Sequence, residues 1–179
     1  MEEDKPSEYV LNFFKERHLE QIRRRESFLS SVGVIVNGLA LAGAVLAFLL
    51  NSYTPSNNID YNSLFWFSLL VSSCLYGLSI YQLYKSFRVP RLEDIETSDC
   101  WLSYYKELVA ENQGHTTPKS LASNLFAENI ISTYSEAEKL NTCSNDLKGK
   151  HLEWSQLFLL ATLAASSIIY AIQKIAIYV

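Results

Sequence analysis

Apolar side chains are concentrated in three long stretches of the chain that contain no charged residue. The first runs from Phe28 to Leu50, the second from Tyr61 to Tyr84 and the third from Trp154 to Gln173. They contain 23, 24 and 20 residues, and about 20 helical residues cross the hydrocarbon core of a bilayer. The pattern therefore predicts transmembrane helices at 28–50, 61–84 and 154–173. The third stretch is the richest in Ser, Thr and Gln, and a soluble core helix is the alternative there.

Helical periodicity continues outside these stretches. No Gly or Pro interrupts the chain between Glu8 and the first stretch, which predicts one helix from Glu8 to Leu50. A shorter helix is predicted to begin near Ser98, and Thr117 followed by a proline marks the start of a long helix in which Gly149 is the one residue that could cause a kink. The apolar stripe of the first helix comprises Val10, Leu11, Phe14, Leu19 and Ile22, and the aromatic face of the shorter helix comprises Trp101, Tyr104, Tyr105 and Leu108.

These elements predict an all-α integral membrane protein with three transmembrane helices and a cytoplasmic helical bundle formed by their extensions. Three helical stems and one shorter helix are enough for a four-helix bundle, which we expect to pack with the membrane helices as one unit. The low content of Gly and Pro, 6 and 4 among 179 residues, agrees with long helices.

The positively charged residues predict the orientation of the chain. Six Lys and Arg residues precede the first stretch, none lies in the loop 51–60, eight lie in 85–153 and one follows the third stretch. By the positive-inside rule, the amphipathic helix 1–27 and the region 85–153 are cytoplasmic, and the loop 51–60 and the tail 174–179 are external. The acidic start of the chain and the late, long apolar stretch argue against a cleaved signal peptide.

The overall charge excludes a general nucleic-acid-binding surface. The formal net charge is -4 and the isoelectric point about 5.4, so no direct binding of nucleic acid is expected. The local triplet Arg23, Arg24 and Arg25 directly precedes the membrane and is predicted to contact anionic lipid headgroups. The three Cys and three His residues show no paired ligand spacing, so neither a metal nor another cofactor nor a disulfide is predicted.

Small residues recur along the first stretch at alternating steps of three and four, as in the seam of a left-handed coiled coil. Two interpretations are open: packing of the three helices within one chain, or association of several copies into a ring lined by small and polar residues such as Asn37. No charged residue lies in any stretch, which excludes a charged selectivity ring, whereas a wide pore needs no charge. The predicted pore or oligomer seam comprises Ser30, Gly33, Asn37, Ala40, Ala44 and Ala47. Further small or polar residues predicted on packing faces are Ser68, Ser72, Ser73 and Gly77 in the second stretch and Thr162, Ser166, Tyr170 and Gln173 in the third.

One short motif is a candidate for catalytic activity. Asn145 and Asp146, followed after four residues by His151, resemble the Arg-x4-6-His motif of HEPN-type ribonucleases, with Asn145 in the place of the Arg. That substitution removes the cation expected to stabilise phosphate charge, so the sequence favours a protein that is not an enzyme. A membrane-anchored ribonuclease that uses His151 is the alternative, and a His151→Ala change would abolish its cleavage of RNA.

The chain resembles the pore-forming membrane accessory protein of type VI-B CRISPR systems in four features. These are this motif, the basic stem before the first span, the tight external loop and the helical cytoplasmic region. More loosely, the arrangement is similar to SLATT-type effectors of prokaryotic defence, which are not expected to end in a third crossing. The resemblance implies a homo-oligomeric pore that permeabilises or depolarises the bacterial inner membrane when a nucleic-acid-sensing partner is activated. A non-conducting scaffold that binds a soluble partner through the face around Trp101 and Tyr105 is a further alternative.

Overall fold

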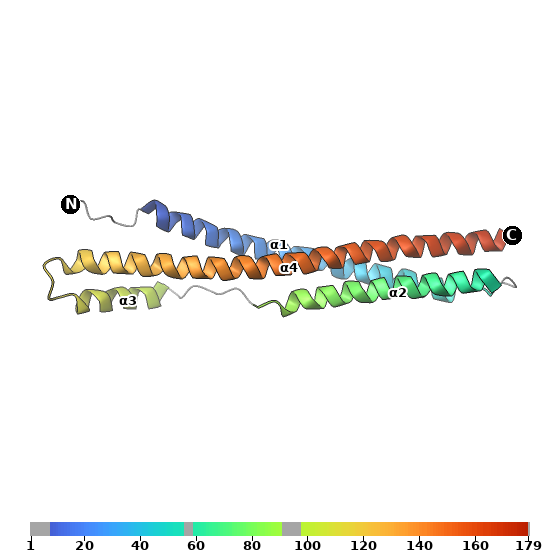
Figure 1. Cartoon of the computed structure of the whole chain (residues 1–179), viewed down its shortest axis with the longest axis horizontal. Coiled ribbons are helices and arrows are strands. Elements are labelled where there is room, and N and C mark those ends of the chain that lie inside the picture. Colours follow the sequence, from blue (N-terminus) through green and yellow to red (C-terminus); the bar gives the residue numbers. More distant parts are fainter. Residues whose placement is uncertain (1–7, 56–58, 91–97, 179) are drawn as a thin grey trace. The chain divides into compact units, whose positions relative to one another are not determined.

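Helices account for the regular secondary structure of the described part of the chain. The computed structural model describes residues 8–55, 59–90 and 98–178. The all-α prediction is confirmed, and α1, α2 and α4 are each long and apolar enough to cross a membrane. The helices are α1 (Glu8–Asn51), α2 (Ile59–Arg88), α3 (Ser98–Glu111) and α4 (Pro118–Tyr178) (Figure 1).

Local sequence signals determine where the helices begin and end. α1 begins at Glu8 and α3 at Ser98, as predicted. α4 begins at Pro118, because proline needs no hydrogen-bond partner in the first turn and its fixed backbone angle suits a helix. α2 ends at Arg88, two residues before a proline that cannot continue it. α4 continues through Gly149 without interruption.

The chain divides into two compact units, so the prediction of a single unit is wrong. Unit 1 contains Met1–Arg25 and Pro90–Asp146, and unit 2 contains Glu26–Val89 and Leu147–Val179. The predicted four-helix cytoplasmic bundle is also wrong. Because α2 ends at Arg88, it supplies no stem to unit 1, whose described helices are α3 and the first parts of α1 and α4.

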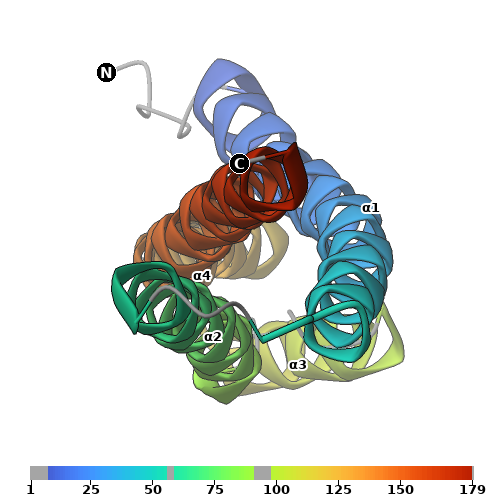
Figure 2. The same cartoon turned by 90° about the vertical axis from the view of Figure 1, so that its right-hand side faces the viewer.

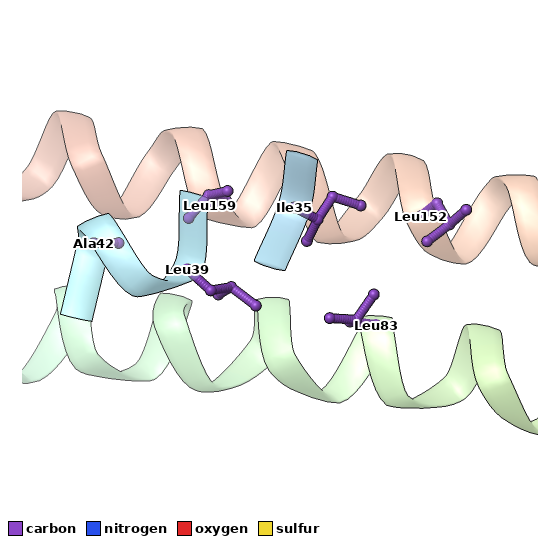
Figure 3. Close-up of a cluster of buried hydrophobic side chains, with 6 residues drawn as sticks. All are labelled: Ile35, Leu39, Ala42, Leu83, Leu152 and Leu159. Carbon is purple, nitrogen blue, oxygen red and sulfur yellow. The ribbon is translucent and has the colours of Figure 1, made fainter. Parts of the chain in front are cut away.

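In unit 2, α1, α2 and α4 pack along a shared apolar core; Figure 2 shows these three helices from one end. In Figure 3, the side chains of Leu83 on α2 and Leu152 on α4 point toward one another. Buried positions recur in each helix at steps of three and four, which is the spacing of coiled-coil packing. The main cluster comprises Ile35, Leu39, Ala42, Leu83, Leu152 and Leu159, and a second cluster comprises Leu49, Phe65, Leu69 and Ile169.

In unit 1, the two described members of the predicted apolar stripe of α1 do not lie on its packed face. Leu19 and Ile22 are exposed, whereas Gln21 is buried and the His18 ring lies edge-on to Tyr134. Polar pairing selects this face, because Gln21 hydrogen-bonds a buried amide of α4 that is described below. The side chains of the other predicted stripe residues, Val10, Leu11 and Phe14, lie outside the described residues.

Candidate functional site

The predicted small-residue seam lies on the outer face of α1 in unit 2. All six residues are exposed, and they lie about half a turn around the helix from the core face that carries Ile35 and Leu39. The three helices of unit 2 therefore pack through another face of α1, and this stripe, termed the α1 stripe, stays uncovered within the described protomer. It comprises Ser30, Gly33, Asn37, Ala40, Ala44 and Ala47.

Large apolar side chains border the α1 stripe. Val34, Leu41 and Phe48 lie along one edge, and Leu29, Val36 and Leu50 lie along the other. The space above the stripe is open at Gly33, where an added Cβ would have no neighbouring atom within 4 Å. A row of small residues between two rows of large ones lets the backbone of another helix approach closely.

Asn37 is the most polar member of the α1 stripe. It lies near the middle of the 28–50 span and is exposed, and no hydrogen bond joins its side chain to another described residue. Facing lipid tails, an amide leaves its donors and acceptor unsatisfied, which costs several kcal/mol. In a bilayer, this side chain therefore needs a partner from outside the described protomer.

Buried polar residues, termed here the polar seam, alternate with buried apolar ones along the core faces of α2 and α4. On α2, Ser72, Ser79 and Ser86 recur every seven residues and are at most 1% exposed. On α4, the polar seam comprises Ser155, Thr162, Ser166 and Gln173, all of which are buried. One side of the unit 2 core, formed by α1, is thus apolar, and the other carries hydroxyl groups and one amide.

Ser79 and Ser155 bind the two helices reciprocally. The Ser79 hydroxyl donates to the Ser155 carbonyl at 2.8 Å, and the Ser155 hydroxyl donates to the Ser79 carbonyl at 2.8 Å. The two Oγ atoms lie 3.2 Å apart. Because each short side chain reaches the main chain of the other helix, the two backbones must run very close together at this point.

Other members of the polar seam are satisfied to different degrees. The Thr162 hydroxyl donates to the carbonyl of Phe158 in its own helix, whereas the buried hydroxyls of Ser72 and Ser166 have no hydrogen-bond partner among the described residues. At the end of the seam, the Gln173 Nε2 donates to the Leu49 carbonyl at 3.3 Å. A buried hydroxyl without a partner costs about 1–3 kcal/mol.

Two glycines of α1 that were not predicted as contacts receive large side chains from the other helices. A Cβ at Gly38 would lie 2.5 Å from Leu159 Cδ2, and a Cβ at Gly43 would lie 3.0 Å from the Tyr76 hydroxyl. Within α4, Gly149 faces Phe28, with 3.3 Å between its ideal Cβ and the Phe28 Cζ. Gly149 therefore serves close packing rather than a kink.

The ribonuclease candidates Asn145 and His151 both make helix contacts. Asn145, in unit 1, is 2% exposed and its Nδ2 donates to the Gln21 Oε1 at 2.8 Å. His151, in unit 2, is half-buried and its Nδ1 lies 2.9 Å from the Gln82 Oε1. Since the amide oxygen can only accept, the His151 Nδ1 is the donor. Each side chain is thus occupied by packing within its own unit.

The predicted headgroup-binding residues Arg23, Arg24 and Arg25 are exposed at the end of unit 1. The Arg24 Nη2 lies 2.7 Å from the Asp146 Oδ1 in an ion pair that is about half exposed on both sides. An exposed pair of this kind contributes at most about 1 kcal/mol to stability.

The aromatic face of α3 packs against the start of α4. The ring of Phe126 lies 6.0 Å from Trp101 and 5.3 Å from Tyr105, measured between centroids, in edge-to-face geometry. The Asn129 side chain hydrogen-bonds the Tyr104 hydroxyl. A pocket of about 500 Å³ lies beside these rings, and it is lined by Trp101, Leu102, Tyr105, Ser123, Phe126 and Ile130.

The sequence prediction found part of the polar seam. Ser72, Thr162, Ser166 and Gln173 were predicted on packing faces and are buried, but Ser73, Gly77 and Tyr170 are exposed. Ser79, Ser86 and Ser155 were not predicted. The signal that could have found the first two is a sustained heptad pattern on α2, which places them in the same register as Phe65 and Ser72.

The chain matches no family model, no curated protein and no solved structure. Its function has to be argued from its own residues.

Proposed function

We propose that the protein is a three-span protein of the bacterial inner membrane whose copies assemble into a pore or membrane-perturbing complex that acts in antiviral defence. Three helices of sufficient length and apolarity support the membrane part of this proposal. The excess of Lys and Arg in 1–27 and 85–153 supports a cytoplasmic N-terminus, with unit 1 on the cytoplasmic side.

The exposed amide of Asn37 is the observation that carries the assembly. In a bilayer it gains a partner if a second copy packs on the α1 stripe, where Ala40 and Ala44 let the two backbones approach. The core of unit 2 uses the opposite face of α1, so this contact leaves the protomer intact.

The composition of the spans favours a pore over an ion-coupled transporter. No Asp, Glu, Lys or Arg lies in 28–50, 61–84 or 154–173, so the spans contain no side chain that could relay a proton or select ions by charge. A pore lined by hydroxyl and amide groups passes small solutes with weak selectivity.

Large side chains placed on the α1 stripe test both the assembly of copies and the flux through the membrane. The A40L/A44L variant places two large side chains where close approach is needed, and we expect a lower particle mass in nanodiscs and loss of dye release from liposomes. The A164L/A171L variant makes the same changes at two exposed alanines of α4 and should keep the wild-type mass and flux. Unchanged mass together with unchanged permeability in A40L/A44L would contradict the proposal, and equal loss in both variants would show that the stripe has no special role.

The defence role rests on the resemblance to the membrane accessory protein of type VI-B CRISPR systems. It is tested in bacteria that express the chain together with an RNA-guided RNA-targeting nuclease and a target transcript. We expect a potential-sensitive dye to report depolarisation only when the target is present, and to report none with A40L/A44L. Depolarisation that does not depend on the target would refute the coupling.

A non-conducting scaffold is the second candidate, because the pocket beside Trp101 and Tyr105 offers unit 1 a site for an apolar group of a soluble partner. Liposome flux separates the two functions. A scaffold assembles and binds its partner without releasing dye, whereas the pore releases it.

A further inference from the structure

The polar seam is the longest buried series of polar side chains among the described residues of unit 2. It extends along α2 from Ser72 to Ser86 and along α4 from Ser155 to Ser166, and Gln173 follows it with a hydrogen bond to Leu49 of α1. The α1 stripe, by comparison, contains two polar residues, Ser30 and Asn37. Polar groups favour hydration of a path, because a narrow apolar constriction excludes water. In the polar seam they alternate with Leu83 and Leu159.

We propose that the conducting path of the protein follows the polar seam, and that the described structure is the closed state. Water and small solutes pass when α2 and α4 separate and their hydroxyl groups turn from each other to solvent. The inference rests on the proposed pore function and adds to it the residues that line and close the path.

The bonds that close the polar seam can be exchanged for bonds to water. Ser79 and Ser155 hold the two helices by neutral hydrogen bonds, and a water molecule can replace each partner without leaving a buried charge. No ion pair joins described residues of α2 and α4. Separation of the helices is therefore limited by packing, by these hydroxyl contacts and by the hydrogen bond between His151 Nδ1 of α4 and Gln82 Oε1 of α2.

The closed state leaves two buried hydroxyls unsatisfied. Ser72 and Ser166 are 0% and 1% exposed, and neither hydroxyl oxygen has a hydrogen-bond partner among the described residues. Water that enters the seam supplies those partners, so hydration stabilises the open state relative to the closed one.

A surface groove of about 130 Å³ lies between α2 and α4, and it is lined by Phe67, Ser68, Val71, Ala165 and Ile168. In the sequence, Ser68 is one turn before Ser72 and Ala165 is next to Ser166. On the other side of the core, α4 is held by α1 through Leu159, which fits against Gly38. Among these contacts, the α2–α4 contact is the one best suited to open.

A reversible covalent lock tests the inference. The S79C/S155C variant, made in a background in which Cys74, Cys100 and Cys143 are replaced by Ala, places two thiols where the hydroxyl oxygens lie 3.2 Å apart. Oxidation in liposomes should lower dye release about tenfold or more, and reduction should restore it. The S79C and S155C single variants, treated with the same oxidant, are the controls and should keep their flux.

The outcomes separate the inference from the proposed function. If the wild-type protein conducts and the oxidised S79C/S155C variant conducts equally well, the inference is overturned and the pore stands. If the wild-type protein releases no dye, the pore function itself fails and the inference fails with it.

A second variant keeps the test independent of the disulfide. S72A removes an unsatisfied hydroxyl without adding volume, so it should stabilise the closed state, raise resistance to SDS unfolding and lower dye release about threefold or more. A purely structural role for Ser72 would raise the resistance and leave dye release unchanged, which would overturn the inference.

Discussion

α4 takes part in two helix contacts of opposite chemistry. In unit 1, its Phe126 packs among the aromatic rings of Trp101 and Tyr105 of α3. In unit 2, its Ser155 exchanges hydrogen bonds with Ser79 of α2. The first contact consists of large aromatic rings, and the second combines small hydroxylated side chains with apolar ones such as Leu83 and Leu152.

The difference is explained by the solvent that the proposed topology gives each unit. In water, burial of apolar surface contributes about 25 cal/mol per Å², so rings are the strongest contact available. In lipid, the surrounding tails are as apolar as leucine, and helices associate instead by close approach and hydrogen bonds. The kind of side chain in a helix contact thus indicates whether water or lipid surrounds the helix pair.

The largest effect is expected where water drives the contact. Phe126→Ala should destabilise the packing of α3 by about 2–3 kcal/mol, because it removes the ring that both Trp101 and Tyr105 contact. Faster hydrogen exchange of the α3 amides in the reconstituted protein measures this loss.

Phe65→Ala is the matched change in unit 2. Phe65 is 0% exposed and stacks on Tyr53. In water, its replacement by alanine would therefore lower stability more than Phe126→Ala does. Surrounded by lipid, Phe65→Ala should cost less than Phe126→Ala in SDS unfolding monitored by circular dichroism, since packing is lost but no transfer from water is. A larger loss at Phe65 than at Phe126 would refute the assignment of solvents.

The sequence was sufficient to predict where the helices lie along the chain, but it was not sufficient to predict which face of each helix is buried. The proline at 118 and the uninterrupted pattern after Glu8 predict helix starts by local chemistry alone. Two series on α1 share the same spacing of three and four, however, one starting at Ser30 and one at Phe28, and nothing in α1 itself decides which is buried. The decision depends on what α2 and α4 present, such as Leu159 opposite Gly38.

A buried amide pair in unit 1 gives the next effect. Asn145→Ala leaves the Gln21 side chain buried without its partner and should cost about 2 kcal/mol. Replacement of both residues by leucine should recover most of this loss, because no unsatisfied polar group remains. Protease resistance of unit 1 in intact proteoliposomes reports both variants, and failure of the double change to recover would argue that the amide pair does more than pack.

Removal of the reciprocal serine bonds should have a smaller effect. The S79A/S155A variant should lower the free energy of unfolding of unit 2 by about 1 kcal/mol, since hydrogen bonds between membrane helices contribute about 0.6 kcal/mol each. A double-mutant cycle with the single alanine variants in SDS titrations measures the coupling. A cost above that of Phe126→Ala would mean that the hydroxyl contact, and not the aromatic one, is the stronger of the two.

Alanine substitutions at two glycines on opposite faces of α1 should have the smallest effects on stability, and they test the α1 stripe most directly. Gly33→Ala meets open space and should stabilise the isolated protomer by about 0.5 kcal/mol through helix propensity, whereas Gly38→Ala must displace Leu159 and should destabilise it. SDS titration of the protomer at high dilution measures both signs. If the stripe is a contact between copies, Gly33→Ala should also lower particle mass in nanodiscs while Gly38→Ala acts mainly on the protomer. Stabilisation by Gly33→Ala with no change in mass would mean that Gly33 faces lipid, and would leave Asn37 without the partner that the assembly requires.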